Sequence, residues 1–169
     1  MISAKQIIEA LGMQPHLVEG GYFVEPYRSE ELIPQVGLPE RYSSERAFGT
    51  AIFYLLTPDT CSALHRLASD EIFHFYLGDP ATMLQLHPDG SAEVITLGQN
   101  ILEGQELQVV VPWGTWQGSF LNEGGQFALL GCTMGPGFEW ADYEHASREH
   151  LLREYPDQRE LIIRLTSRE

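Results

Sequence analysis

Two histidines and a glutamate lie within ten residues in the segment LHRLASDEIFHFYLG, residues 64–78. A histidine beside a carboxylate can act as a general base, because the carboxylate orients the ring and favours the imidazolium as it forms. We take His65 and Glu71 as this pair, since on an extended strand with a local turn they can face the same way. His74 follows Glu71 by three residues, so we place it on the opposite face of the strand. The segment therefore predicts a polar site for proton transfer or metal binding.

The donors available to a metal ion are few. A tight transition-metal site generally needs three or four nitrogen, oxygen or sulfur ligands. Besides His65 and Glu71, the segment PWGTWQ offers only Gln117, whose amide oxygen is a poor ligand. We therefore expect no tightly bound metal or other cofactor. A weakly bound divalent metal, if there is one, would be held by His65, Glu71 and Gln117.

Short strands must position these residues. Between residues 50 and 134 the chain is rich in β-branched and aromatic residues, and turn signals such as HPDG and NEGG separate the segments. No helical segment interrupts them, which excludes βαβ crossovers and predicts an antiparallel small barrel or jelly roll. The predicted strands are TAIFYLL, EIFHFYLG, TMLQLH, AEVITL, LQVVV, TWQGSFL and QFALLGCTM.

The N-terminal region predicts one helix and then irregular chain. Ser3 and Gln6 form a capping box, and Gly12 ends the helix. Residues 13–49 are rich in Gly, Pro, Glu and Ser, and within them residues 24–27 predict an edge segment interrupted by a proline.

The C-terminal region predicts two further helices, one from His145 to Tyr155 and a last one capped by Asp157 and Glu160. We expect a single domain over residues 1–169, with a barrel core at about 50–134 and a helical tail at about 143–167.

The composition excludes several classes of partner. The chain has 24 acidic and 10 basic residues and a formal charge of −14. This charge repels phosphate backbones, so we expect no nucleic-acid partner. No apolar run reaches the length of a membrane span, so we expect no membrane partner. Cys61 and Cys132 are expected as buried thiols in a reducing compartment, and the N-terminal segment is too mixed for a signal peptide, which predicts a cytoplasmic location.

The spacing of these residues resembles that of the cupin superfamily. Its first motif runs Gly, five residues, His-x-His, three or four residues, Glu, six residues, Gly, and its second contains Pro-x-Gly-x-x-His. Leu67 stands where the second histidine belongs, and Gln117 stands where the third belongs. The residues that fall on motif positions are His65, Glu71, Gly78, Pro112 and Gly114.

Within the superfamily the chain resembles the single-domain cupin-five family of bacteria and fungi. The segments that carry the resemblance span roughly residues 15–156: VEGGYF followed by YRS, TAIFYLLTP, ALHRLASDEIFHFYLGDP, VVVPWGTWQ and GCTMGPGFEWADYE leading into LLREYP. The resemblance implies an all-β dominated fold, a cupin jelly-roll β-barrel with short N-terminal and C-terminal helices. It also implies a homodimer and structural similarity to dTDP-sugar epimerases.

Three functional hypotheses follow. The first is metal-independent isomerase or epimerase chemistry on a sugar or nucleotide sugar, with His65 as base, Glu71 orienting it and Gln117 holding a substrate oxygen. His65 matches the base of the epimerases that the fold resembles. Their tyrosine acid has no match on its strand, so Tyr54 or Tyr76 would replace it only by facing inward. The other hypotheses are a non-catalytic module that binds a small polar organic ligand and a metal-dependent cupin enzyme.

Further side chains are candidates for ligand binding. Arg28 can fold over the barrel mouth and bind a carboxylate or phosphate, or it can pair with Glu25 or Glu30 at the surface. Trp116 can pack in the core or rim, or stack on a sugar. We expect residues 136–144 to form a strap that packs its aromatic side chains on the barrel or on a partner subunit.

Overall fold

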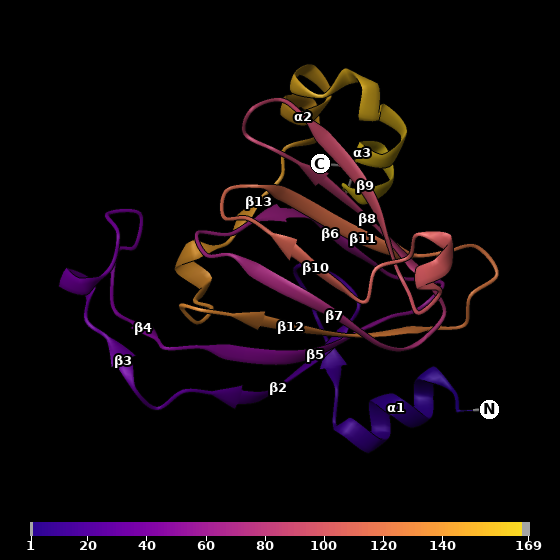
Figure 1. Cartoon of the computed structure of the whole chain (residues 1–169), viewed down its shortest axis with the longest axis horizontal. Coiled ribbons are helices and arrows are strands. Elements are labelled where there is room, and N and C mark those ends of the chain that lie inside the picture. Colours follow the sequence, from indigo (N-terminus) through magenta and orange to yellow (C-terminus); the bar gives the residue numbers. More distant parts are fainter. Residues whose placement is uncertain (1, 167–169) are drawn as a thin grey trace.

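Two β-sheets face each other in the computed structural model, which describes residues 2–166, and helices cover their outer faces (Figure 1). The first sheet has the strand order β1-β2-β5-β12-β7-β10, and the second has the order β13-β6-β11-β8-β9. Neighbouring strands pair antiparallel, which confirms the predicted cupin jelly roll. The strands of the first sheet are β1 (Gln14–Pro15), β2 (Tyr22–Arg28), β5 (Thr50–Leu56), β7 (Glu71–Gly78), β10 (Gln108–Val111) and β12 (Ala128–Met134). Those of the second are β6 (Cys61–Arg66), β8 (Ala81–Leu86), β9 (Ala92–Leu97), β11 (Trp116–Leu121) and β13 (Glu144–His145).

Helix α1 (Ala4–Leu11) covers the outer face of the first sheet. It begins at the predicted capping box of Ser3 and Gln6 and ends at Gly12, whose φ of 65° is the left-handed conformation that glycine adopts easily. Its buried Ile7 packs with Leu55 on the outer side of β5. The amphipathic pattern read from the sequence therefore gives both the helix and its packing face.

Helices α2 (Arg148–Glu154) and α3 (Arg159–Leu165) cover the outer face of the second sheet. The predicted start of the first of them at His145 is wrong, because β13 pairs His145 with His65 on β6. The predicted caps of the last helix are also wrong: α3 follows Gln158, and no side chain caps it. Residue 167, the predicted end of the tail, lies outside the described residues. The 3₁₀ turns are η1 (Gln35–Gly37), η2 (Ile101–Glu103), η3 (Trp140–Asp142) and η4 (Pro156–Gln158).

Side chains alternate between the inside of the barrel and its outer faces. On β5, Tyr54 and Leu56 belong to the core between the sheets, whereas Leu55 faces α1. On β11, Trp116 belongs to the apolar cluster under α2 and α3, whereas its neighbour Gln117 bonds to residues inside the barrel. This period of two decides which candidate residues can reach an internal site.

His65 and Glu71 come from different sheets. We expected one extended strand with a local turn, but residues 61–66 form a separate strand, β6, that was missing from the predicted set. The chain then turns and crosses to the first sheet, where Glu71 opens β7. The expectation of one strand is therefore wrong, because the intervening turn carries the chain across the barrel.

Residues 29–47 form an arm that projects beyond the barrel (Figure 1). It contains the two-stranded ribbon of β3 (Leu32–Ile33) and β4 (Arg46–Ala47). No helix within residues 2–166 has the length and apolarity to cross a bilayer.

Candidate functional site

Gln117 links His65 and Glu71 inside the barrel. β6 pairs with β11 so that His65 lies directly opposite Gln117, which places their side chains on the same face. Gln117 Nε2 donates to His65 Nε2 at 2.8 Å and to Glu71 Oε2 at 2.9 Å. The structure thus brings together the three residues that the motif spacing singled out, and all three are buried.

The orienting partner of His65 is a backbone carbonyl. His65 Nδ1 lies 2.7 Å from the carbonyl oxygen of Ala63, which can only accept a hydrogen bond, so Nδ1 carries the ring proton. Nε2 then accepts from Gln117, and in this arrangement the imidazole is neutral. Our prediction that Glu71 orients the ring by direct contact is therefore wrong, because Gln117 lies between Glu71 and His65 and bonds to both.

Glu71 is a neutral acid near pH 7. Its pKa is raised to about 8, chiefly by burial and in smaller part by the negative charge of Glu19, while a hydrogen bond with Cys132 partly opposes the shift. A protonated carboxyl group inside the barrel can donate a proton or a hydrogen bond, whereas the sequence led us to expect a carboxylate at Glu71.

Sequence reasoning missed Glu19 and His16, which the loop before β2 carries into the barrel mouth. Glu19 Oε1 accepts from Ser62 Oγ at 2.5 Å, while its Oε2 lies 3.8 Å from His16 Nε2 and 3.9 Å from His65 Nε2. Gly20 follows with a φ of 97°, and a Cβ there would collide with the carbonyl oxygen of Cys61. The Gly-Gly pair of VEGGYF was therefore the available signal that this loop approaches the barrel closely.

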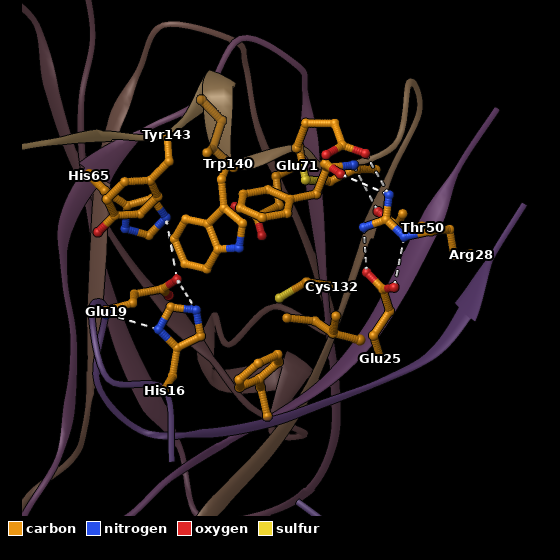
Figure 2. Close-up of a pocket in the computed structure, with 16 residues that line it drawn as sticks. His16, Glu19, Glu25, Arg28, Thr50, His65, Glu71, Cys132, Trp140 and Tyr143 are labelled. Atoms are coloured by element: carbon orange, nitrogen blue, oxygen red, sulfur yellow. Dashed lines mark hydrogen bonds and ion pairs between the residues drawn. The ribbon is translucent and has the colours of Figure 1, made fainter. Parts of the chain in front are cut away.

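A cavity of about 270 Å³ opens beside these groups (Figure 2). In the view of Figure 2, His16, Glu19 and His65 lie at one end and Arg28 at the other, with Trp140 and Cys132 between them. Most of the wall between the ends is apolar. The lining residues are His16, Glu19, Phe23, Glu25, Arg28, Thr50, Ile52, His65, Leu67, Glu71, Cys132, Met134, Phe138, Glu139, Trp140 and Tyr143.

The expected strap supplies one wall of the cavity. Tyr143 stacks on the ring of His65, with centroids 5.0 Å apart, and its hydroxyl group contacts His145 Nδ1 at 3.3 Å. A buried ion pair holds the strap: Arg46 Nε and Nη2 donate to the carboxylate of Asp142 at 2.8 and 2.6 Å. Both side chains are almost fully enclosed, at 0% and 2% exposure.

Arg28 lies at the cavity mouth and is engaged there. Arg28 lines the cavity and pairs with Glu25, one of its two expected surface partners, through two 2.9 Å contacts, while binding of a ligand by Arg28 stays a prediction. It also donates to Glu139 at 2.9 Å and to the carbonyl oxygen of Phe138 at 3.1 Å. These contacts join the mouth of the barrel to the strap.

The remaining candidates lie outside the cavity lining. Tyr54 faces inward, but its hydroxyl donates to the carbonyl oxygen of Gly20 at 2.6 Å and so supports the loop that carries Glu19. Trp116 packs under α2 and α3, because the strand period turns it outward, and sugar stacking by Trp116 is therefore not supported.

His74 contacts Thr133 at 3.0 Å and stacks on the half-exposed Tyr76. His74 lies on the face opposite Glu71, as predicted, and Tyr76 does not reach the site.

The side chains at the motif positions do not fit a cupin metal site. They provide one imidazole, one carboxyl group and an amide whose nitrogen faces both. Leu67, at the position of a second imidazole, supplies no donor. Within the described residues 2–166, no group of three or more His, Cys, Asp or Glu side chains has the geometry to hold a metal ion. We therefore derive no chemistry through a metal.

The fold and motif positions define a cupin barrel. The chain matches the family described as Cupin superfamily (DUF985) over residues 5–146 and belongs to that family. The uncharacterized protein YML079W of Saccharomyces cerevisiae is 30% identical over 159 residues, covering 89% of this chain and 79% of the yeast protein.

Two solved structures share this fold over nearly their whole length. The chain is similar to protein SO0799 from Shewanella oneidensis, with 34% identity, a TM-score of 0.87 and full coverage of both chains. It is also similar to a hypothetical protein from Leishmania major, with 28% identity, a TM-score of 0.87 and coverage of 99% and 100%. The expected similarity to dTDP-sugar epimerases is tested by none of these matches and stays a prediction.

Proposed function

We propose that this chain is a small-molecule-binding cupin whose ligand occupies the cavity beside His65. One observation supports this most strongly: a cavity of about 270 Å³ has polar groups at both ends and a largely apolar wall between them. Ligand sites commonly combine an apolar lining with a few placed polar groups. The ligand places a polar group near Glu19 and His65 and a ring or hydrocarbon part between Phe23 and Trp140.

Ligand-observed NMR tests this proposal. A set of small neutral, cationic and anionic organic compounds is screened for saturation transfer from the protein. Ile52→Phe adds bulk at a cavity-lining position and should weaken any cavity ligand at least tenfold. The matched control Val94→Phe changes a half-exposed position on β9 and should leave binding unchanged. Equal loss in both variants, or no compound bound by the wild type, would refute the proposal.

Metal-independent isomerase or epimerase activity is the second candidate, because a neutral Glu71 and the carboxylate of Glu19 line the same cavity. An environment that keeps one carboxyl group protonated beside an ionised one suits acid–base chemistry. His65 would take a proton from the carbon beside a carbonyl group, and the carbon–hydrogen electron pair would form the double bond of an enol. Glu71 would protonate the carbonyl oxygen, and the reverse transfer would return a proton to carbon without net oxidation.

Gln117 has a part in this second candidate. Its amide nitrogen donates a hydrogen bond to the lone pair of His65 Nε2, so that this lone pair is not free. Its Oε1 is buried with no partner among the described residues. Rotating the amide by half a turn would free the Nε2 lone pair and then offer Oε1 to the protonated ring. Glu19, 3.9 Å away, would stabilise the imidazolium.

Solvent deuterium exchange tests the catalytic candidate. Keto-sugars incubated in D₂O should gain deuterium with the wild type, also after chelator treatment, and His65→Ala should abolish the gain. Exchange that survives in His65→Ala, or that stops on chelation, would contradict it. If compounds bind and are recovered without deuterium, the protein is a binding module.

We also propose a homodimer, as the family resemblance implies. The projecting arm supports this, since its Leu32 and Val36 are exposed apolar side chains that a second copy would cover. Light scattering should give twice the chain mass of 19.1 kDa, and a mass of one chain would refute the dimer. The cytoplasmic location stays a prediction.

A further inference from the structure

The carboxylate of Glu19 carries a negative charge that no neighbouring side chain neutralises in the described structure. Its Oε1 accepts from the neutral hydroxyl of Ser62, and its side chain is only 16% exposed. Its Oε2 lies 3.8 and 3.9 Å from the nearest imidazole nitrogens, beyond hydrogen-bond distance. A partly buried carboxylate of this kind is stabilised by a cation or by strong donors.

The two imidazoles beside Glu19 do not supply that positive charge. His16 Nδ1 accepts the backbone N–H of Glu19 at 2.9 Å, so the neutral ring carries its proton on Nε2. Burial is the largest cause of a lowered pKa at His16, which favours this neutral form. His65 is likewise neutral in its bonds to Ala63 and Gln117. Both rings therefore border Glu19 as polar, uncharged walls.

The charge of Arg28 is already matched by carboxylates. Among the described residues that line the cavity, Arg28 is the only guanidinium or ammonium group. It is paired with Glu25 and Glu139, and it lies at the end of the cavity away from Glu19 (Figure 2). The lining therefore has a net negative charge when the imidazoles are neutral, and this charge disfavours phosphate and carboxylate ligands.

Aromatic rings border the space next to Glu19. His16 contacts Phe23 and Trp140 with ring centroids 4.8 and 5.7 Å apart. Trp140 in turn meets Tyr143 at 5.6 Å and a tilt of 59°. Ring faces set at an angle beside a carboxylate are the surroundings that stabilise an organic cation.

We propose that the ligand of this cavity carries a protonated amine, which binds the carboxylate of Glu19 between His16 and His65, with its hydrocarbon part against Trp140 and Phe23. The inference rests on the proposed binding function and holds whether or not the protein is a catalyst. The ammonium group donates to Glu19 Oε2, and its remaining charge faces the aromatic rings. The ligand class is thus a small primary amine rather than a phosphorylated compound.

Calorimetry with three compounds of matched shape tests this inference. Cyclohexylammonium, cyclohexanol and cyclohexanecarboxylate share one ring and differ in charge. Near neutral pH the wild type should bind cyclohexylammonium at least tenfold more tightly than cyclohexanol, because a hydrogen bond to a charged group is stronger than a neutral one. Cyclohexanecarboxylate should bind most weakly.

Glu19→Gln should abolish the preference for cyclohexylammonium, because the amide keeps the shape of the side chain and removes its charge. The control Glu9→Gln changes an exposed glutamate of α1 that pairs with Lys5, and it should keep the wild-type order. Equal wild-type affinities for the amine and the alcohol, or no binding of the amine, would overturn the inference even if Glu19→Gln does not fold. A preference that survives in folded Glu19→Gln would also overturn it.

Trimethylcyclohexylammonium, which keeps the ring and the charge of cyclohexylammonium, separates this assignment from binding by aromatic rings alone. It should bind at least tenfold more weakly than cyclohexylammonium, because it has no N–H to donate. Tighter or equal binding would contradict the role of Glu19. If these amines fail while neutral compounds still bind the cavity in the NMR screen, the proposed function stands and only this inference falls.

Discussion

Glu19 Oε2 in the loop before β2 lies 3.9 Å from Nε2 of His65 on β6. The contact joins a segment outside the barrel strands to the residue that the cupin motif singles out. It places a carboxylate at the open side of the buried His65–Gln117–Glu71 group. The chemistry of the cavity therefore depends on the N-terminal loop as much as on the barrel.

Glu71 should make the protein less stable as pH rises. Its pKa is about 8 in the folded protein against an ordinary value of 4.5, so between these values the folded state binds more protons than the unfolded state. The contribution of Glu71 to the free energy of unfolding is full below pH 4.5. It is lost as pH rises towards 8, at up to about 1.4 kcal/mol per pH unit. Glu71→Gln should remove this part of the pH dependence and exceed the wild type in stability at pH 8.

Urea unfolding at several pH values between 5 and 8 measures this effect. Glu93→Gln, at an exposed position on β9, is the matched control and should follow the wild-type curve. Parallel curves for the wild type and Glu71→Gln would mean that Glu71 is ionised in the folded protein.

Asp142→Asn should destabilise the protein by about 3–5 kcal/mol, because it leaves the buried guanidinium of Arg46 without its counter-ion. Chemical denaturation gives the free energy of unfolding. Glu149→Gln breaks an exposed pair with Arg153 and should cost less than about 1 kcal/mol. Similar costs for the two variants would show that the Arg46–Asp142 pair does not anchor the strap.

Restoring the missing imidazoles should create a metal site. Leu67 lines the cavity and Gln117 contacts both His65 and Glu71, so Leu67→His with Gln117→His would give three imidazoles and one carboxyl group. Titration with Ni²⁺ or Zn²⁺ should show one tight site in the double variant, at least a hundredfold stronger than in the wild type. Tight binding by the wild type at one equivalent would contradict our reading of the donor set.

Trp140→Ala should weaken a ring-bearing cavity ligand about tenfold with little loss of stability, because half of Trp140 is exposed and the rest faces the cavity. Trp113 is exposed to the same degree but contacts Arg41 instead. Trp113→Ala should therefore leave affinity unchanged in calorimetry. A loss shared by both variants would indicate a general effect of removing a tryptophan.

The barrel strands could be read from the sequence because alternation and turn residues are local signals. TAIFYLL and AEVITL coincide with β5 and β9, and the capping box of Ser3 fixes the start of α1. β13 could not be found in this way, since a strand of two residues has no period. It exists because His145 pairs with His65 far away in the chain.

Only the site residues that lie at motif positions could be predicted from the sequence. The spacing of His65, Glu71 and Gln117 identified the buried group, but it did not show that Gln117 would hold the other two. Glu19 and Tyr143 were missed, because tertiary packing alone brings them to His65. The protonated state of Glu71 also depends on burial and on the charge of Glu19, which are features of the folded chain.

The central claim is that the cavity between Glu19 and Trp140 holds an organic ligand. A crystal structure with a compound that binds in the NMR screen tests it most directly. We predict density for the compound inside the cavity, with a polar atom within hydrogen-bond distance of Glu19 or His65 and carbon atoms against Trp140. Density for the bound compound at another surface, with the cavity closed by its own side chains, would contradict the account.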